Sequence, residues 1–536
     1  MLWMWIAVVL ACTSPTVGEA DCGLTPTSTP QAIAPHDVVR FAPYPPVEGA
    51  ALTVTYTGRL AGREGVIAEV GFDGWGLRSA PAGASTGETL ELDRYAFQRF
   101  TMTSDTAGSH ATFDLPDGVR AVHLRFYDPV TAEIDDRNGR EFHLGVTYPY
   151  IGPYLTLPDD PATEAAIHFE VTDPGPVDVV LTDPLGAAVR VTSTSDDTQH
   201  HVVVGGLAPG TAYTYRIEGS DGRVSASHVL TTAVTRAETF GFVVVADMQD
   251  AGGPDERWSD VALAIEQTHP DAAFVLAPGD LASNDHPGPW WLFFDAGRSL
   301  FASTPLVPVI GNHDTRTRAS HADSRSFARY FDRPLDELAR RVDYGSVDLF
   351  VLSSELPAAM TSCAPAYGWL DDALDEADGT WAFAAFHHSP YDASERFALE
   401  QPLYRPVTAL FEGRVDWVFT GHTHIAQRFL PLRYGAEPAP SGLYGRGDDD
   451  GVGYLVLPGC ETLPIDGLVA PGDLGSEARD LLVFPELAQD QVDVDVEHGW
   501  AWAEVTPEQL TLMVYGIGWY DDEVPPHVRD QVVHPR

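Results

Sequence analysis

Residues 240–249 read FGFVVVADMQ, an uninterrupted apolar run that ends in an acidic residue, a methionine and an amide. A continuous apolar run of this length is typical of a β-strand that is buried on both faces, as in a parallel sheet. Similar short runs recur further along the chain, and helical patterns separate them. We expect strands at residues 240–246, 272–276, 306–310, 349–352, 381–386, 415–419 and 453–457, helices at 260–268, 290–301 and 369–377, and a hairpin around 500–515. This order predicts an α/β fold with a largely parallel sheet.

Polar residues with ligand character follow five of the expected strands. Asp247 and Gln249 follow the first strand, and Asp280 follows the second. The other three strands are followed by Asn312, His313 and Asp314, by His387 and His388, and by His422 and His424. Because ligands of open α/β sheets bind at the carboxyl ends of the strands, we expect the five loops to converge on one crevice.

This set of side chains favours a pair of metal ions. It offers two carboxylates, two carboxamides and three or four imidazoles. Such a set exceeds what one tetrahedral zinc ion takes and suits two metals with open positions. A carboxylate can bridge metals about 3.5–4 Å apart, and such a pair turns a shared water into hydroxide near neutral pH. An aspartate after a strand often caps a helix instead, but the joint occurrence of these motifs at strand ends favours the metal site.

Taken in chain order, the motifs D-x-Q, G-D, G-N-H-D, H and G-H-x-H resemble those of the calcineurin-like metallophosphoesterases, and among them the purple acid phosphatases. The similarity includes residues 326–331 and 368–370 and covers roughly residues 240–430. It implies a four-layer α/β/β/α phosphoesterase domain over residues 236–536. It also implies hydrolysis of phosphate esters by attack of a metal-bridging hydroxide, with two divalent or trivalent ions of iron, zinc or manganese.

The resemblance assigns a role to each of these side chains. The first metal takes three ligands, the second takes three, and one carboxylate bridges both. These are Asp247, Gln249 and His424 for the first metal, Asn312, His422 and one of His387 and His388 for the second, and Asp280 for the bridge. The family's His-His-Pro-Pro-Tyr form favours His387, whereas its His-x-Pro form leaves His388 as the alternative.

Two catalytic residues also follow from the resemblance. His313 would face the scissile phosphate, where it stabilises developing charge or protonates the leaving oxygen. Asp314 would orient His313.

Two positions depart from the family pattern. Gln249 stands where many family members have histidine, so the first metal is expected to bind less tightly or to differ in identity. Ser283 stands where purple acid phosphatases have a tyrosine ligand. Without a tyrosinate there is no iron charge-transfer band, so we expect a colourless enzyme without a ferric first site.

The beginning of the chain is typical of an exported protein. Residues 1–22 contain a short apolar run followed by small residues, and Cys12 directly follows Leu10-Ala11. This arrangement resembles a bacterial lipoprotein signal, with a lipid anchor at Cys12, and a plain signal peptide is the alternative. We therefore expect an extracytoplasmic protein that is secreted, periplasmic or anchored to the outer membrane. Residues 23–37 form a linker, and Cys363 and Cys460 are the candidates for a disulfide, with two buried thiols as the alternative.

Two β-sandwiches are expected before the phosphoesterase domain. Residues 38–150 alternate short strands and turns, and a weak resemblance to starch-binding modules raises the alternative that Trp75 stacks on a polysaccharide rather than filling the core. Residues 151–235 resemble a fibronectin type III domain, chiefly through the aromatic alternation of residues 207–216. We assign this second sandwich a structural role.

The charge of the chain limits its partners. It carries 78 acidic residues against 32 basic ones, a formal net charge of −46, and all of the basic residues are arginine. The absence of lysine excludes a P-loop lysine and a Schiff base, and the negative field disfavours nucleic acid. We predict a phosphoesterase that acts on small phosphomonoesters. The alternatives are a phosphodiesterase of the same fold, and a surface carbohydrate-binding protein with a degenerate phosphoesterase scaffold.

Overall fold

The computed structural model describes most of the chain from residue 38 onward. The described ranges are 38–47, 49–75, 88–92, 95–136, 141–195, 197–236, 239–249, 257–315, 324–333, 339–355, 365–460, 467–471, 473, 476–485, 497–518 and 524–536. The predicted signal, the linker, Cys12 and Cys363 lie outside these ranges, whereas Cys460 is described and buried. Within the described part, no helix has both the length and the apolar character needed to cross a bilayer.

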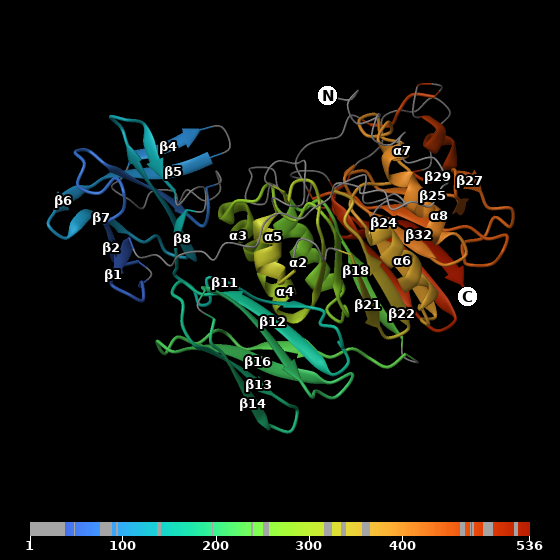
Figure 1. Ribbon diagram of the computed structural model, residues 1–536, viewed down its shortest axis with the longest axis horizontal. Coiled ribbons are helices and arrows are strands. Elements are labelled where there is room, and N and C mark those ends of the chain that lie inside the picture. The colour runs from blue at the N-terminus through green and yellow to red at the C-terminus, as the bar shows by residue number, and fades with distance from the viewer. Residues whose placement is uncertain are drawn as a thin grey trace.

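Two antiparallel sheets with a common apolar core form the N-terminal part (Figure 1). One contains β1 (Val39–Ala42), β2 (Ala51–Tyr56), β7 (Gly108–Asp114) and β6 (Thr103–Asp105). The other contains β10 (Phe142–Gly145), β8 (Ala121–Asp128), β3 (Ile67–Phe72), β5 (Tyr95–Thr101) and β4 (Glu88–Leu92), with β9 (Glu133–Asp135) paired to β8. Trp75 is only 8% exposed and contacts the ring of Phe97, so it fills a core position and offers no platform for a sugar.

A four-stranded sheet follows, formed by β14 (Ala188–Ser193), β13 (Val177–Thr182), β16 (Ala212–Gly219) and β17 (His228–Thr231). Its apolar side chains share a core with those of β11 (Ile151–Thr156), β12 (Glu164–Glu170) and β15 (Gln199–Gly205). These three strands belong to a larger sheet, because β11 pairs in parallel with β20 (Leu306–Val309) through Thr156 and Leu306. Backbone hydrogen bonding therefore continues across the boundary expected near residue 235.

The larger sheet has nine strands in the order β15-β12-β11-β20-β19-β18-β30-β31-β32. Its remaining members are β19 (Val275–Pro278), β18 (Phe240–Val244), β30 (Gly499–Val505), β31 (Gln509–Gly516) and β32 (His527–Pro535). Strands β18, β19 and β20 are parallel, and the C-terminal strands pair antiparallel. The expected hairpin around residues 500–515 is formed by β30 and β31, and β32 is the edge strand beyond it.

A second, seven-stranded sheet completes the C-terminal half. Its strands are β21 (Arg340–Tyr344), β22 (Val347–Val351), β23 (Trp381–Ala385), β24 (Trp417–Thr420), β28 (Gly453–Val456), β25 (Gln427–Phe429) and β29 (Leu482–Phe484). A short pair, β26 (Leu432–Arg433) and β27 (Glu437–Pro438), lies outside it. One buried cluster contains side chains of both large sheets, for example Phe242 against Phe383 and Phe419. The strand order predicted a largely parallel sheet and the family resemblance implied two sheets. The structure has two large sheets, each with antiparallel edges.

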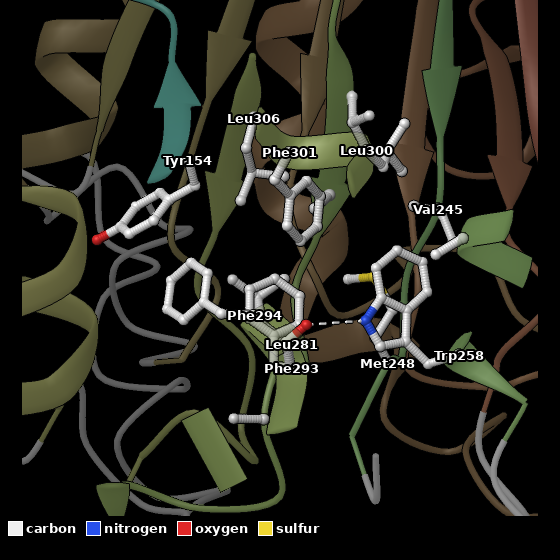
Figure 2. Close-up of a cluster of buried hydrophobic side chains, with 14 of the residues drawn as sticks. Tyr154, Val245, Met248, Trp258, Leu281, Phe293, Phe294, Leu300, Phe301 and Leu306 are labelled. Atoms are coloured by element: carbon white, nitrogen blue, oxygen red, sulfur yellow. Dashed lines mark hydrogen bonds between the residues drawn. The ribbon is translucent and has the colours of Figure 1, made fainter. Parts of the chain in front are cut away.

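Helices accompany both large sheets. A cluster that includes nine-stranded-sheet residues also holds side chains of α2 (Trp258–Thr268), α3 (Pro287–Ala296), α4 (Arg298–Ser303) and α5 (Arg325–Phe331). Figure 2 shows part of this cluster, in which Trp258 donates an indole hydrogen bond of 3.1 Å to the carbonyl oxygen of Phe293. A third cluster contains side chains of the seven-stranded sheet and of three helices, α6 (Pro365–Asp375), α7 (Gln401–Tyr404) and α8 (Thr408–Phe411). Two 3-10 turns, η5 (Arg405–Val407) and η6 (Ser476–Leu481), also contribute to it.

The expected helix at residues 290–301 is divided into α3 and α4 at Gly297. A Cβ atom at Gly297 would lie 2.4 Å from the ring of Phe301, so the chain turns where a side chain has no room.

Candidate metal centre

The loops that carry the expected ligands come from both large sheets. The nine-stranded sheet supplies Asp247 and Gln249 after β18, Asp280 after β19, and Asn312, His313 and Asp314 after β20. The seven-stranded sheet supplies His387 and His388 after β23 and His422 and His424 after β24. Asp280, His387 and His422 offer ligand atoms that all lie within 4.8 Å of one another. The five loops therefore meet where the two sheets face each other, as expected.

At the centre, His387 joins residues of three loops. Its Nδ1 lies 2.9 Å from the carbonyl oxygen of Pro278, and because a carbonyl only accepts, Nδ1 carries the proton. Its Nε2 lies 3.1 Å from Oδ2 of Asp280 and 3.2 Å from Oδ1 of Asn312. In neutral imidazole this places three lone pairs face to face, so the arrangement requires a positive charge, either a proton on Nε2 or a metal ion. The donor atoms fit a metal cation, and the hydrogen bond from Nδ1 would fix the ring for that purpose.

The pKa shifts of these buried groups also indicate that the site favours a positive charge. Burial alone would lower the pKa of His387, but the carboxylates of Asp280, Asp247 and Glu355 raise it to about 10. Burial alone would raise the pKa of Asp280, but His387 and His313 hold it below its usual range. Burial, with a contribution from Asp280, raises the pKa of Asp247 to about 8. The buried carboxylates of the site therefore favour a positive charge on or beside the ring of His387.

The other group of ligands lies around Asp247. Its two carboxylate oxygens accept hydrogen bonds of 2.9 and 3.0 Å from the backbone N–H of His422. Nε2 of His424 lies 3.5 Å from Oδ1 of Asp247 and 3.1 Å from the side-chain amide of Gln249. Asp247, Gln249 and His424 are therefore adjacent, as the expected ligand set of the first metal requires.

Four of the expected ligands have a strained backbone. The φ angles are +58° for Asp247, +56° for Asp280, +75° for His422 and +55° for His424. Non-glycine residues rarely adopt this left-handed region, and each instance costs on the order of 1–3 kcal/mol. Such strain concentrates at functional sites. There it directs side chains toward a common point that an unstrained loop would not allow them to reach.

The glycines of the motifs allow the ligands to approach. A Cβ atom at Gly311 would lie 2.2 Å from the backbone nitrogen of Asp280 and 2.3 Å from its Oδ1. A Cβ atom at Gly421 would lie 2.7 Å from Oδ2 of Asp247. The glycine that precedes one ligand thus makes room for a ligand of another strand.

Asp314 ties two of the loops together. Its Oδ1 accepts hydrogen bonds of 2.9 Å from the backbone N–H groups of both Leu281 and Ala282, and its Oδ2 accepts one of 2.8 Å from Gly311. The neighbouring His313 donates its backbone N–H to Oδ1 of Asp280 at 2.7 Å. Asp314 therefore fixes the loop on which His313 stands, and its direct orientation of the His313 ring stays a prediction.

His388 occupies a different environment from His387. Its Nδ1 lies 3.0 Å from Oγ of Ser354, and its ring stacks on Tyr404 with 4.6 Å between centroids. The ring also lies 4.3 Å from that of His422. His388, Glu400 and His422 form a second group of neighbouring ligand atoms.

Three residues near the site belong to no motif and were missed by the sequence analysis. Oε2 of Glu400 lies 3.5 Å from Nε2 of His422, and the ring centroid of Phe397 lies 4.0 Å from that of His422. The guanidinium carbon of Arg396 lies 5.0 Å from the Phe397 ring. A charged and aromatic segment shortly after the His387-His388 pair was the only available signal in the sequence.

Comparison with known proteins places this site in context. Residues 240–426 match the family model of the calcineurin-like phosphoesterases. Purple acid phosphatase 21 of Arabidopsis thaliana is 29% identical over 264 residues, which cover 45% of this chain and 56% of that protein. A protein of Rhodopseudomonas palustris named "Probable cyclic nucleotide phosphodiesterase" is 29% identical over 188 residues, or 32% of this chain and 64% of that protein. This chain thus spans little more than half the length of such relatives.

Two solved structures have the same fold over most of the chain. Purple acid phosphatase PPD1 of yellow lupin superposes with a TM-score of 0.59 at 15% identity, covering 91% of this chain and 93% of the lupin chain. PhoD superposes with a TM-score of 0.57 at 13% identity, covering 73% of this chain and 91% of the PhoD chain.

Proposed function

We propose that this chain, which contains a calcineurin-like phosphoesterase domain similar to those of purple acid phosphatases, hydrolyses phosphate esters at a pair of metal ions. The observation that carries the proposal is the position of His387. Its Nε2 lies within 3.2 Å of oxygens of Asp280 and Asn312, which come from two other loops. Three potential ligand atoms from three loops that meet in a buried place are what a bound cation requires, and they support this proposal over a degenerate scaffold.

The ligand assignment follows the geometry. Oδ2 of Asp280 lies 3.1 Å from Nε2 of His387, and its backbone carbonyl accepts hydrogen bonds from Met248 and Gln249, so we propose that its carboxylate would bridge both metals. The first metal would take Asp247, Gln249 and His424, and the second would take Asn312, His387 and His422. We prefer His387 to His388 because Nε2 of His387 lies beside Asp280 and Asn312, whereas Nδ1 of His388 binds Ser354.

The metals and the protein would have separate tasks in the reaction. The metal pair, when bound, supplies Lewis acidity and a water of lowered pKa. Asp314 holds the loop of residues 311–314 against residues 281 and 282, and the backbone N–H of His313 donates to Asp280. From there the imidazole of His313 would hydrogen-bond the phosphate and give a proton to the leaving oxygen. Ser283 provides no tyrosinate, so we propose a colourless enzyme with zinc, manganese or iron in the divalent state.

We propose phosphomonoesters as the substrates, since purple acid phosphatases predominate among the relatives. The relative named as a cyclic nucleotide phosphodiesterase supports a diester as the second candidate.

The proposed four-layer order of helices, two sheets and helices is supported by the three apolar clusters of this half of the chain. Export and a lipid anchor at Cys12 stay proposals, because residues 1–37 lie outside the described ranges.

The test is hydrolysis of a nitrophenyl phosphate monoester and of the matching diester by protein reconstituted with zinc, manganese, iron or magnesium. The Asn312→Ala variant removes one proposed ligand. Gln509→Ala removes an exposed carboxamide at the start of β31, near the end of the sheet where β18 begins and away from the loop of Asp247. We expect a metal-dependent rate that Asn312→Ala reduces at least 100-fold and Gln509→Ala leaves unchanged. Absence of hydrolysis of both esters with every metal would contradict the proposal.

A further inference from the structure

A short segment at residues 392–401, here called the lip, borders the proposed metal centre. Asp392 anchors it, because its fully buried carboxylate accepts hydrogen bonds from the backbone N–H and the hydroxyl of Ser394 at 2.8 and 2.9 Å. The same carboxylate accepts a bond of 2.8 Å from the amide of Gln427, which also donates to Oγ1 of Thr423 at 3.2 Å. Since Thr423 stands between His422 and His424, one network fixes the lip to the loop of two expected ligands.

The lip presents an aromatic ring and a guanidinium beside that loop. The ring of Phe397 leans on the imidazole of His422, with 4.0 Å between centroids and 43° between planes. The guanidinium carbon of Arg396 lies 5.0 Å from the centroid of Phe397. A guanidinium over an aromatic face is held in place without losing its hydrogen-bond donors. Arg396 is exposed and lies beside the ring that packs against His422.

Arg396 also has no ion-pair partner within the described ranges, and the carboxylate of Glu400 interacts with it only at longer range. Arg414, by contrast, pairs with Asp371 and Asp375. In a chain with a net charge of −46, an exposed and unpaired cation at this place attracts an anion.

We propose that Arg396 binds the phosphate group of the substrate and makes the enzyme prefer dianionic monoesters to monoanionic diesters. This inference rests on the proposed phosphoesterase function. A phosphate monoester carries nearly two negative charges at pH 7 and offers three oxygens to the fork of a guanidinium, whereas a diester has one charge and two free oxygens. Phe397 sets the position of Arg396, and the Asp392 network sets the position of the lip, so the guanidinium is ordered before the substrate arrives.

The experiment compares Arg396→Gln with the wild-type chain and with Arg414→Gln, which removes an arginine paired on the surface of α6 and α8. Binding of inorganic phosphate to the metal-reconstituted proteins is measured by calorimetry, and kcat/KM is measured for a nitrophenyl monoester and diester. We expect Arg396→Gln to weaken phosphate binding and to lower kcat/KM for the monoester about tenfold each, and to lower the diester value by about threefold or less. Phe397→Leu should shift the same ratio in the same direction, and metal content should stay at the wild-type level in every variant.

The outcomes separate this inference from the function on which it rests. If Arg396→Gln and Phe397→Leu both bind phosphate as the wild type does and keep the wild-type ratio of monoester to diester, the role of Arg396 is wrong while the phosphoesterase stands. If the wild type neither hydrolyses the esters nor binds phosphate with any metal, the proposed function itself fails, and the role of Arg396 fails with it.

Discussion

The Nε2 atom of His387 lies 3.1 Å from Oδ2 of Asp280, although the two residues follow strands of different sheets. Asp280 comes after β19 of the nine-stranded sheet, and His387 comes after β23 of the seven-stranded sheet. The contact closes the gap between the sheets at the carboxyl ends of their parallel strands. A cation between these groups would therefore bind the two halves of the domain to each other as well as to a substrate.

The two neighbouring histidines are expected to respond differently to truncation. His387→Ala should lose about one metal ion per chain and at least 100-fold in activity, because it removes the ligand beside Asp280. His388→Ala should keep the metal content, because its Nδ1 is bound to Ser354. Elemental analysis of the reconstituted variants decides between them, and metal loss in His388→Ala alone would reverse the assignment.

Gly311 is expected to tolerate no side chain. The added Cβ atom of Gly311→Ala would lie 2.2 Å from the backbone nitrogen of Asp280, so the loop must move and shift the carboxylate of Asp280, the proposed bridge. We expect metal affinity to fall at least tenfold, measured by titration with a metal-sensitive dye. Gly368→Ala in α6 is the matched control, since nothing lies within 4 Å of its added atom. Equal affinity in both variants would show that the close approach at Gly311 is unimportant.

Asp314 is expected to contribute to stability as much as to activity. Asp314→Ala would leave three backbone N–H groups without their acceptor, at a cost of about 1 kcal/mol or more each. We therefore expect the free energy of unfolding of the metal-free protein to fall by about 3 kcal/mol in urea denaturation. Asp371→Ala, which breaks an exposed ion pair with Arg414, should cost less than about 1 kcal/mol. A purely catalytic role for Asp314 predicts the opposite, with activity lost and stability unchanged.

The local patterns of the sequence identified the strands and the residues at their ends. Each buried strand has its own apolar run, and the expected ligands follow within five residues of a strand's end, so neither inference needed long-range information. The match of residues 240–426 to the calcineurin-like phosphoesterases confirms the family that the motifs indicated.

The pairing of strands depends on contacts that no local pattern encodes. The parallel register of Thr156 with Leu306 joins β11 to a strand about 150 residues away, so the extension of the nine-stranded sheet was not predictable. The lip was missed for a related reason. Arg396 and Phe397 are of interest only because they lie near the ring of His422. His422 follows a different strand, so the local sequence does not show that they are neighbours.

Acid is expected to destabilise the protein through buried histidines such as His269. Its ring stacks on Trp502 at 4.1 Å, and burial lowers its pKa to about 4. The unfolded chain takes up this proton near pH 6.5, so the stability that His269 contributes is complete above that pH and is lost as the pH falls towards 4. His269→Phe keeps the stacking and should remove about 1 kcal/mol of this loss, measured by urea denaturation between pH 4 and 7. An unchanged pH dependence would show that His269 accepts a proton in the folded state.

The most direct test of the proposed centre is the number of metal ions bound per chain after reconstitution, in the wild type and in Asp280→Asn. The carboxamide keeps the shape of the side chain but bridges two metals poorly, so circular dichroism should confirm an unchanged fold. We predict about two ions per wild-type chain and about one or fewer in the variant, with activity lost in parallel. A wild-type chain that binds no more than one ion at saturation, or a variant that keeps both, would contradict a binuclear centre bridged by Asp280.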